Sequence, residues 1–421
     1  MANKYYDIII IGGGIAGLYS AYTIKHLSPS ARILVLEKSK KSEVGGRANN
    51  DTFYGANIVT GAGIGRKGAD PILFKLCKKL GVETSFHKSV MNYSEAITSK
   101  GSVDDTMKVT DKLMREYKTN PQLYKMLTFK QFAQKILGEK EYKTFVLMSG
   151  YTDYENADVS ETLYNYGMDD TKGGWTMFYL SWKKLVDKLV DQIGLESFRF
   201  SQNIVGIKKV SADPVVFKIE SESGIDFYCG KVVIATTIDA TIKLVPGKSS
   251  SSIYKQIHGQ PFLRLYAKFD KASTMILQKY VTAYTNVTGP LQKIIPMDAE
   301  KGVYMISYSD NKCARALKPY ITNTQKNRNF IADLTEKALG IPNGELHIIA
   351  LKAYYWEIGT HYYEPLKEPY TSRDEFVYKA QHPEVGVVVV GEAVSRHQGW
   401  VEGALESVNK AITSNWISGA T

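Results

Sequence analysis

Residues 5–17 read YYDIIIIGGGIAG, and residues 32–37 read RILVLE. Each apolar run is typical of a strand that is buried on both faces, and the glycines after the first run have the spacing GxGxxG. A helix is expected over residues 18–26, between the two strands. The order strand, glycine turn, helix and strand predicts a βαβ unit that binds a dinucleotide where its first turn meets the helix.

Three glycines and one acid of this unit have separate physical tasks. Gly12 permits the tight turn, Gly14 lets the backbone approach a pyrophosphate, and Gly17 lets helix and strand pack closely. Glu37 follows Gly17 by 20 residues, where a carboxylate accepts hydrogen bonds from ribose hydroxyls. The expected cofactor contacts of the unit are Gly12, Gly14, Ile15, Ala16, Gly17, Glu37 and Lys38.

Two further segments bear on whether the dinucleotide is NAD or FAD. Residues 45–47 read GGR, and residues 387–404 read VVVVGEAVSRHQGWVEGA. Together with the βαβ unit they resemble the FAD-dependent amine oxidase superfamily, which contains monoamine, polyamine and L-amino-acid oxidases. The resemblance implies FAD, with Arg47 at a phosphate or closing the flavin site. It also implies a helix near Val401 whose N-terminus stabilises negative charge on the flavin.

Shorter matches extend the resemblance along the chain. Residues 61–64, GAGI, resemble the segment that passes the flavin ring, and Val205 resembles a valine whose backbone pairs with adenine. Residues 232–236 resemble the strand and turn on the adenine side, and residues 150–158, GYTDYENAD, resemble amine-oxidase-like proteins of large DNA viruses. The resemblance adds these FAD contacts: Gly45, Gly46, Arg47, Gly61, Ala62, Gly63, Ile64, Val205, Thr236, Gly391, Glu392, Trp400, Val401 and Ala404.

The resemblance implies that a C–N bond of the substrate is oxidised at the flavin and that oxygen is the electron acceptor. In such enzymes a lysine near the flavin lies on a strand of the substrate domain. The matching strand here covers residues 260–269, and Arg264 stands at the lysine position. Arginine stays charged at any working pH and could clamp a carboxylate. Lys268, on the same face of the strand, is the alternative.

Two aromatic walls over the flavin are also implied by the resemblance. Trp400 takes one wall, and His361 stands where the second aromatic is expected. A histidine there could act as a base or contact an acidic substrate, or it could be a solvated loop residue. Thr360 stands where covalent members carry a cysteine, so FAD is expected to be non-covalent. Three acids could hold a polyamine: Asp153, Glu155 and Asp158. Acids in such a segment are more often a solvated loop face or a helix cap.

Composition bears on partners and compartment. The net charge is +10, but the lysines are scattered, so no nucleic acid is expected as a partner. Three cysteines without CxxC spacing give neither a zinc site nor a disulfide framework. A reducing compartment is expected, namely the cytoplasm, or the host cytoplasm or virion if the chain is virus-encoded. No run of 18 apolar residues is present, so no membrane anchor is expected. The sequence leaves open whether the chain forms a homodimer.

The chain of 421 residues is too long for one ordinary core. The predicted fold class is α/β, with a Rossmann-type FAD-binding domain (a doubly wound sheet) interleaved with an α+β substrate domain and a helical insert. The FAD-binding domain is expected at 1–87, 175–250 and 376–421, the helical substrate region at 88–174, and the sheet-based substrate domain at 251–375.

Apolar periodicity and turn residues give the other expected elements. Helices are expected over residues 71–81, 110–117, 128–137, 175–193 and 401–416. Strands are expected over residues 203–209, 215–220, 226–229, 231–236, 261–270, 302–309 and 385–390.

The leading hypothesis is an FAD-dependent oxidoreductase that acts on a small amine or amino acid. A desaturase or dehydrogenase of the protoporphyrinogen or phytoene type is an alternative, because these enzymes share the cofactor motifs and have little need of the lysine that Arg264 replaces. A third hypothesis is a non-catalytic flavoprotein with a structural or binding role.

Overall fold

The computed structural model describes residues 5–166, 173–247 and 251–419. Seven strands form one of its sheets: β1 (Tyr5–Ile11), β2 (Ile33–Leu36), β9 (Phe198–Arg199), β10 (Ile204–Ala212), β11 (Val215–Ser221), β12 (Asp226–Ile234) and β18 (Val387–Val389). Their order is β10-β11-β12-β1-β2-β9, and β18 pairs with β12. β1 is parallel to β2 and to β12, as a βαβ crossover requires.

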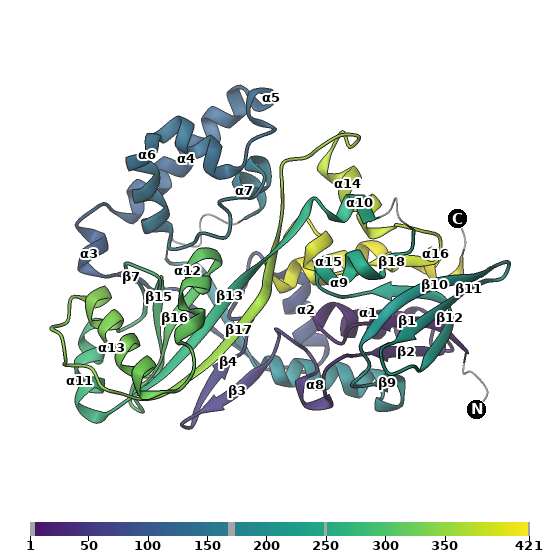
Figure 1. Cartoon of the computed structure of the whole chain (residues 1–421), viewed down its shortest axis with the longest axis horizontal. Coiled ribbons are helices and arrows are strands. Elements are labelled where there is room, and N and C mark those ends of the chain that lie inside the picture. Colours follow the sequence, from purple (N-terminus) through teal and green to yellow (C-terminus); the bar gives the residue numbers. More distant parts are fainter. Residues whose placement is uncertain (1–4, 167–172, 248–250, 420–421) are drawn as a thin grey trace.

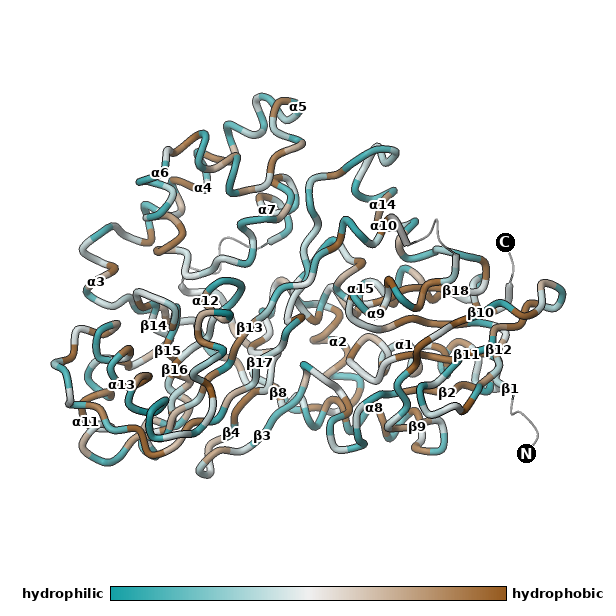
Figure 2. Tube along the Cα trace, viewed as in Figure 1, coloured by the Kyte–Doolittle hydropathy of each residue, from teal (hydrophilic) through white to brown (hydrophobic). Residues whose placement is uncertain are grey.

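The apolar run of β1 is buried on both faces, as predicted. Ile8 and Ile10 belong to one hydrophobic cluster, whereas Ile9 and Ile11 belong to a second cluster across the sheet. Neighbouring side chains on a strand point to opposite faces, so a continuous apolar run serves both clusters. Figure 2 shows hydrophobic stretches along strands of this sheet.

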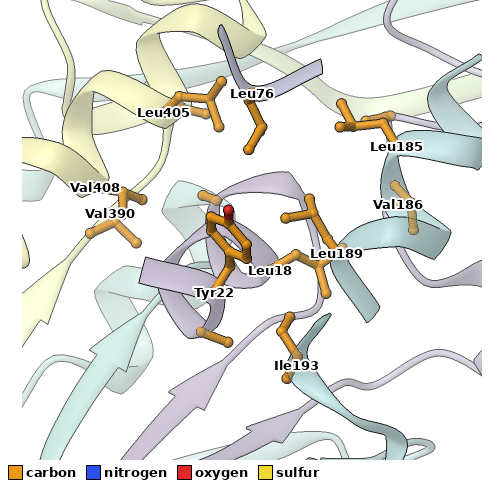
Figure 3. Packing of buried hydrophobic residues seen from close by; sticks show 14 of the residues in the cluster. Leu18, Tyr22, Leu76, Leu185, Val186, Leu189, Ile193, Val390, Leu405 and Val408 are labelled. Carbon is orange, nitrogen blue, oxygen red and sulfur yellow. The ribbon is translucent and has the colours of Figure 1, made fainter. Parts of the chain in front are cut away.

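Helices from both ends of the chain cover one face of this sheet: α1 (Ile15–Leu27), α2 (Pro71–Lys79), α8 (Trp182–Ile193) and α15 (Val401–Ala411). Figure 3 shows Leu18 and Tyr22 of α1 packed among Leu76, Leu189 and Leu405. On the other face, α9 (Ile238–Leu244) and α14 (Arg373–Gln381) contribute to the second cluster. Helices therefore lie on both faces of a mainly parallel sheet, which is the predicted α/β architecture.

A six-stranded sheet forms the other large layer, in the order β17-β13-β16-β15-β14-β7. Its strands are β7 (Met91–Tyr93), β13 (Ile257–Phe269), β14 (Tyr284–Asn286), β15 (Lys293–Asp298), β16 (Val303–Asp310) and β17 (Ile348–Tyr363). One face packs on α11 (Lys271–Tyr280), α12 (Asn311–Leu317) and α13 (Gln325–Leu339). Figure 1 shows β13 and β17 reaching from this sheet toward the first one.

A group of helices stands apart from both sheets in Figure 1: α4 (Val103–Thr119), α5 (Pro121–Tyr124), α6 (Phe129–Ser149) and α7 (Val159–Asn165). The short helix α3 (Glu95–Thr98) lies beside the second sheet, where the Ser94 N–H donates to the Asn286 carbonyl. Aromatic residues such as Phe129, Phe132 and Tyr154 form a separate cluster within the group α4 to α7. Smaller elements are β3 (Asn50–Phe53), β4 (Ala56–Val59), β5 (Gly65–Arg66), β6 (Thr84–Lys88), β8 (Thr176–Leu180), α10 (Ser251–Tyr254) and α16 (Ser414–Ser418).

Several predicted elements were wrong in detail. The helix expected over residues 175–193 is the strand β8 followed by α8, because Phe178 is buried, Tyr179 is exposed, and Ser181 caps the helix by accepting a hydrogen bond from the Lys184 N–H. The helix expected over residues 401–416 ends at Ala411, and α16 follows it. The strands expected at 226–229 and 231–236 are the single strand β12.

Some strands had no sequence prediction. The long strand β17 was missed because glycine and many tyrosines obscure its alternation, although it pairs with β13 along most of that strand. β7 lies within residues 88–174, the region expected to be helical, where it pairs with β14. No helix in the described part of the chain is long and apolar enough to cross a membrane.

Candidate cofactor and substrate site

One cavity of about 2750 Å³ extends from the turn between β1 and α1 to the second sheet. Most of the residues predicted for the site line it: Gly12, Gly14, Ile15, Ala16, Glu37, Lys38, Gly45, Gly46, Arg47, Gly61, Ala62, Gly63, Ile64, Thr236, Arg264, His361, Gly391, Glu392, Trp400, Val401 and Ala404. Three predicted residues, Gly17, Val205 and Lys268, are not part of the lining.

The glycine turn has the geometry that the sequence predicted. Gly12 has a φ of +109°, and a Cβ there would overlap the carbonyl of Ala235. A Cβ on Gly17 would overlap the carbonyl of Gly12, so Gly17 acts through packing rather than by facing the cavity. A Cβ on Gly14 would meet nothing within 4 Å, and no side chain caps α1. The first N–H groups of α1 are therefore available to an anion in the cavity.

Glu37 lies just beyond the end of β2, beside this turn. Its Oε2 accepts a hydrogen bond of 2.6 Å from the Gly13 N–H, and its Oε1 accepts one of 2.7 Å from the Ser39 N–H. Each carboxylate oxygen has a second lone pair. The backbone thus fixes a carboxylate that can still accept hydrogen bonds from hydroxyl groups.

Val205, whose backbone was expected to pair with adenine, lies next to the cavity. The residue is 53% exposed and is not part of the lining, whereas its neighbour Ile204 is. The pairing of β10 with β11 shifts register between Ile204 and Gly206, as a β-bulge does. Any contact of Val205 with a ligand would therefore involve its backbone.

A buried network joins three distant segments at the middle of the cavity. Arg47 Nη1 donates to the Gly359 carbonyl at 2.5 Å and to Glu392 Oε1 at 3.1 Å. The Gly399 N–H donates to Glu392 Oε2 at 2.9 Å. Burial raises the pKa of Glu392, but His361, Arg47 and the Gly399 N–H outweigh it and lower that pKa to about 2. A permanent carboxylate therefore holds the GGR segment to the C-terminal segment.

His361 does not form a wall of the kind expected, and it is not a loop residue. It lies on β17 with its side chain 1% exposed. Its Nε2 accepts a hydrogen bond from the Ile238 N–H at 3.2 Å, and its Nδ1 lies 2.5 Å from Glu392 Oε1. Because Nε2 accepts, the proton is on Nδ1, which donates to Glu392. Both nitrogens are engaged, so His361 positions Glu392 instead of acting as a base.

The N-terminus of α15 faces the cavity, as the resemblance implied. Trp400 precedes the helix, and no side chain caps its first turn. Glu402 also lines the cavity, but its carboxylate is engaged, because it accepts hydrogen bonds from the Ile72 and Leu73 N–H groups at the start of α2. Trp400 packs edge-on against Trp182, with ring centroids 5.9 Å apart. An anionic group in the cavity would meet the positive end of this helix dipole.

Three features of the structure fit a flavin dinucleotide in this cavity. Cβ atoms on Gly14, Gly46 and Gly63 would point into open space. Two helices, α1 and α15, present uncapped N-termini to the same cavity. Thr360, which stands where covalent members of the resembling family carry a cysteine, also lines this cavity.

Arg264 lies in the cavity wall and is 5% exposed. Its Nε donates to the Gly61 carbonyl at 3.3 Å, and its guanidinium carbon lies 3.6 Å from the centroid of the Tyr308 ring. No ion pair links Arg264 to a carboxylate of the described residues within 4.0 Å. Lys268 lies four residues further along β13, about 13 Å away, where its Nζ donates to the Phe269 carbonyl. The structure thus places Arg264, and not Lys268, at the cavity.

An acidic and aromatic group at the far end of the cavity was largely missed from the sequence. Asp153, Asp310, Tyr166 and Tyr308 line it, and the Tyr166 hydroxyl donates to Asp153. Asp310 accepts hydrogen bonds from the Thr152 N–H and hydroxyl, and its pKa is raised by burial. The alternation of β16 could have revealed Asp310 and Tyr308, since β16 pairs Tyr308 with Arg264.

The three acids suggested for a polyamine have different positions. Only Asp153 lines this cavity. Glu155 is buried and accepts a hydrogen bond from Tyr142 in a neighbouring pocket. Asp158 caps α7 by accepting hydrogen bonds from the Ser160 and Glu161 N–H groups. None of the three forms a solvated loop face, and the cap interpretation is correct for Asp158.

Asp153 makes the stability of the protein depend on pH. Burial, and next the charge of Asp310, raises the pKa of Asp153 from 3.8 to about 7. The raised pKa favours folding below about pH 4, and this contribution is lost as the pH rises through 7. We expect Asp153→Asn to remove that loss. Between about pH 4 and pH 7, the free energy of unfolding of the variant should therefore rise relative to that of the wild type by up to about 1.4 kcal/mol per pH unit.

Urea unfolding at about pH 5 and pH 8 measures this effect. The exposed Asp104→Asn variant on α4 is the control, and its difference from the wild type should not vary with pH. Parallel pH profiles for Asp153→Asn and the wild type would show that Asp153 titrates normally in the folded protein.

Comparison with known proteins identifies the fold. Residues 10–80 match the family model of an NAD(P)-binding Rossmann-like domain. No curated protein matched the chain. Solved structures match it over nearly its whole length, so the likeness covers both sheets and the helical group.

Two kinds of oxidase are among these structures. A double mutant of putrescine oxidase, from a redesign of cofactor binding, has a TM-score of 0.76 at 14% identity and covers 98% of this chain and 99% of its own. The wild-type enzyme bound to putrescine has a TM-score of 0.75 at 13% identity, with coverage of 97% and 98%. Cyclohexylamine oxidase from Brevibacterium oxydans IH-35A has a TM-score of 0.74 at 16% identity, with coverage of 98% and 99%. At these identities the likeness establishes the fold.

Proposed function

We propose that this chain is an FAD-dependent oxidoreductase that oxidises a C–N bond of a small amine or amino acid, with oxygen as the electron acceptor. The observation that carries the proposal is the single cavity that joins the uncapped N-termini of α1 and α15 to Arg264 and the acidic group around Asp153 and Asp310. The similar folds of putrescine oxidase and cyclohexylamine oxidase support amine chemistry.

Distinct parts of the cavity would hold FAD. The N–H groups at Gly14 and Ile15 would bind the pyrophosphate, and Glu37 would accept hydrogen bonds from the ribose. The N-terminus of α15 would stabilise negative charge on the flavin ring. Thr360 offers a hydroxyl and no thiol at the position where covalent relatives carry cysteine, so FAD would be held without a covalent bond.

The flavin, when bound, supplies the acceptor for the hydride that leaves the substrate carbon. The residues of the chain orient the substrate and exclude water. Phe262 and Tyr308 flank the Arg264 guanidinium, whose centre lies 4.3 and 3.6 Å from their rings. A guanidinium held in this way can orient a substrate carboxylate or balance negative charge near the flavin. Trp400 would supply an apolar wall elsewhere in the same cavity.

An anaerobic titration tests the proposal. The purified protein should be yellow, and a panel of monoamines, diamines and amino acids should contain a compound that bleaches the visible flavin absorbance without oxygen. Admission of air should then restore the colour and release peroxide. If no member of the panel bleaches the flavin, the amine oxidase proposal fails, and bleaching by a porphyrinogen or polyene instead would establish the desaturase alternative.

Acid precipitation tests how the flavin is held. The flavin should appear in the supernatant, because Thr360 cannot form a thioether. Flavin that remains in the protein pellet would contradict non-covalent binding.

A further inference from the structure

Lys293 is a fully buried lysine beside the acidic end of the cavity. It is the first residue of β15, and its side chain has 0% exposure. Its Nζ lies 2.8 Å from the centroid of the Tyr151 ring and 4.9 Å from that of Tyr308. The Tyr284 ring is also within 6.0 Å. Tyrosine rings around an ammonium group are the arrangement that proteins use to bind amine ligands.

The two acids of this region also interact with Lys293. Asp153 and Asp310 line the cavity, and the Lys293 ammonium opposes the effect of burial on the pKa of both carboxyls. Lys293 itself is absent from the cavity lining, whereas Tyr151, Tyr284 and Tyr308 belong to it. The chain's own ammonium therefore lies behind tyrosine rings of the cavity wall, close enough to both carboxyls to lower their pKa values.

A second cation lies close to this end of the cavity. The Arg264 guanidinium lies 3.6 Å from the centroid of Tyr308, the ring that Lys293 also approaches. A further ammonium beside Tyr308 would therefore meet two fixed positive charges, and the repulsion between like charges in a buried site is large.

We propose that Lys293 occupies the subsite that would otherwise receive the distal ammonium of a diamine, and that it thereby restricts the cavity to substrates with a single amino group. This inference rests on the proposed amine oxidase function for its substrate class. It concerns binding, and it can therefore be tested without turnover.

The test compares two ligands of equal length, hexylamine and 1,6-diaminohexane, by calorimetry on the purified flavoprotein at about pH 8. The wild type should bind hexylamine more tightly than the diamine by at least about tenfold, because of the charge repulsion. Lys293→Met keeps the length and apolar character of the side chain and removes the charge. It should reverse the preference, because one buried carboxylate is then left for the distal ammonium.

Three variants make the result specific. Lys293→Arg keeps the positive charge and should keep the preference of the wild type. Lys312→Met removes a lysine that binds Glu155 at 2.9 Å, outside the lining of this cavity, and should also change nothing. Asp310→Asn combined with Lys293→Met should abolish the gained diamine binding, because it removes a carboxylate that Lys293 had balanced.

Several outcomes would overturn the inference. Equal binding of both ligands by the wild type would do so, and so would an unchanged ligand ratio in a folded Lys293→Met variant. If Lys293→Met does not fold, the wild-type ratio and the Lys293→Arg ratio decide. If neither protein binds any amine, the inference is wrong. A clear monoamine preference in a protein that no amine bleaches would leave the inference standing and would contradict the proposed oxidase function.

Discussion

The Gly14→Leu variant is expected to fold normally and to purify without flavin. A Cβ at this position points into open space, and the backbone is extended, with a φ of −73° and a ψ of 177°. The protein can therefore accept a side chain here. The leucine would fill the space beside the first N–H groups of α1 and block the approach of a pyrophosphate. Loss of two charge-assisted hydrogen bonds lowers the affinity for FAD by more than about 100-fold.

The flavin content of the purified variant and its Tm check this result together. The matched control is Gly68→Leu, because a Cβ on Gly68 also meets nothing within 4 Å and Gly68 is absent from the cavity lining. The control should retain its flavin. Full flavin occupancy in Gly14→Leu would mean that the dinucleotide does not lie at the N-terminus of α1.

Replacing Arg264 by methionine is expected to slow flavin reduction or flavin reoxidation by about 100-fold, the usual effect of removing one charge-stabilising group. The side chain is buried in the cavity wall, between Phe262 and Tyr308. Methionine fills a similar volume, so the loss of rate would report the loss of charge. Stopped-flow measurement of both half-reactions separates the two steps.

Two variants of the same strand sharpen this experiment. Arg264→Lys should recover part of the rate, because it restores the charge without the planar fork. Lys268→Met removes a cation from the same face of β13 but outside the cavity, and both half-reactions should keep the wild-type rate. If Arg264→Met reduces and reoxidises the flavin at the wild-type rates, Arg264 contributes only to packing.

Local rules made the cofactor end of the site readable from the sequence. The apolar run of β1, the glycine spacing and Glu37 lie within one βαβ unit, so strand burial and turn geometry fix their relative positions. Gly12 accordingly forms the predicted tight turn, and Gly14 leaves open space beside the start of α1. Arg47 and Glu392 were assigned to the same site, but their direct contact depends on packing between segments that are 345 residues apart.

The substrate end of the site was harder to predict because it depends on strand pairing. Asp310 and Tyr308 face Phe262 and Arg264 only through the register of β16 on β13, and no local signal gives that register. Lys293 looks like an ordinary surface lysine in the sequence. The rotation of His361 toward Glu392 follows from its place on β17, a strand that the sequence pattern did not reveal.

The network of Arg47, Gly359 and Glu392 also sets an order of events during synthesis. Arg47 leaves the ribosome early, but its carbonyl acceptor is 312 residues away and its carboxylate partner is 345 residues away. Contacts between such distant segments form late, because the intervening chain must first be made and closed into a loop. The α15 N-terminus follows the carboxylate in sequence. The nascent chain therefore has no complete cofactor cradle until α15 has been synthesised, so no dinucleotide can be held by all parts of the site before that point.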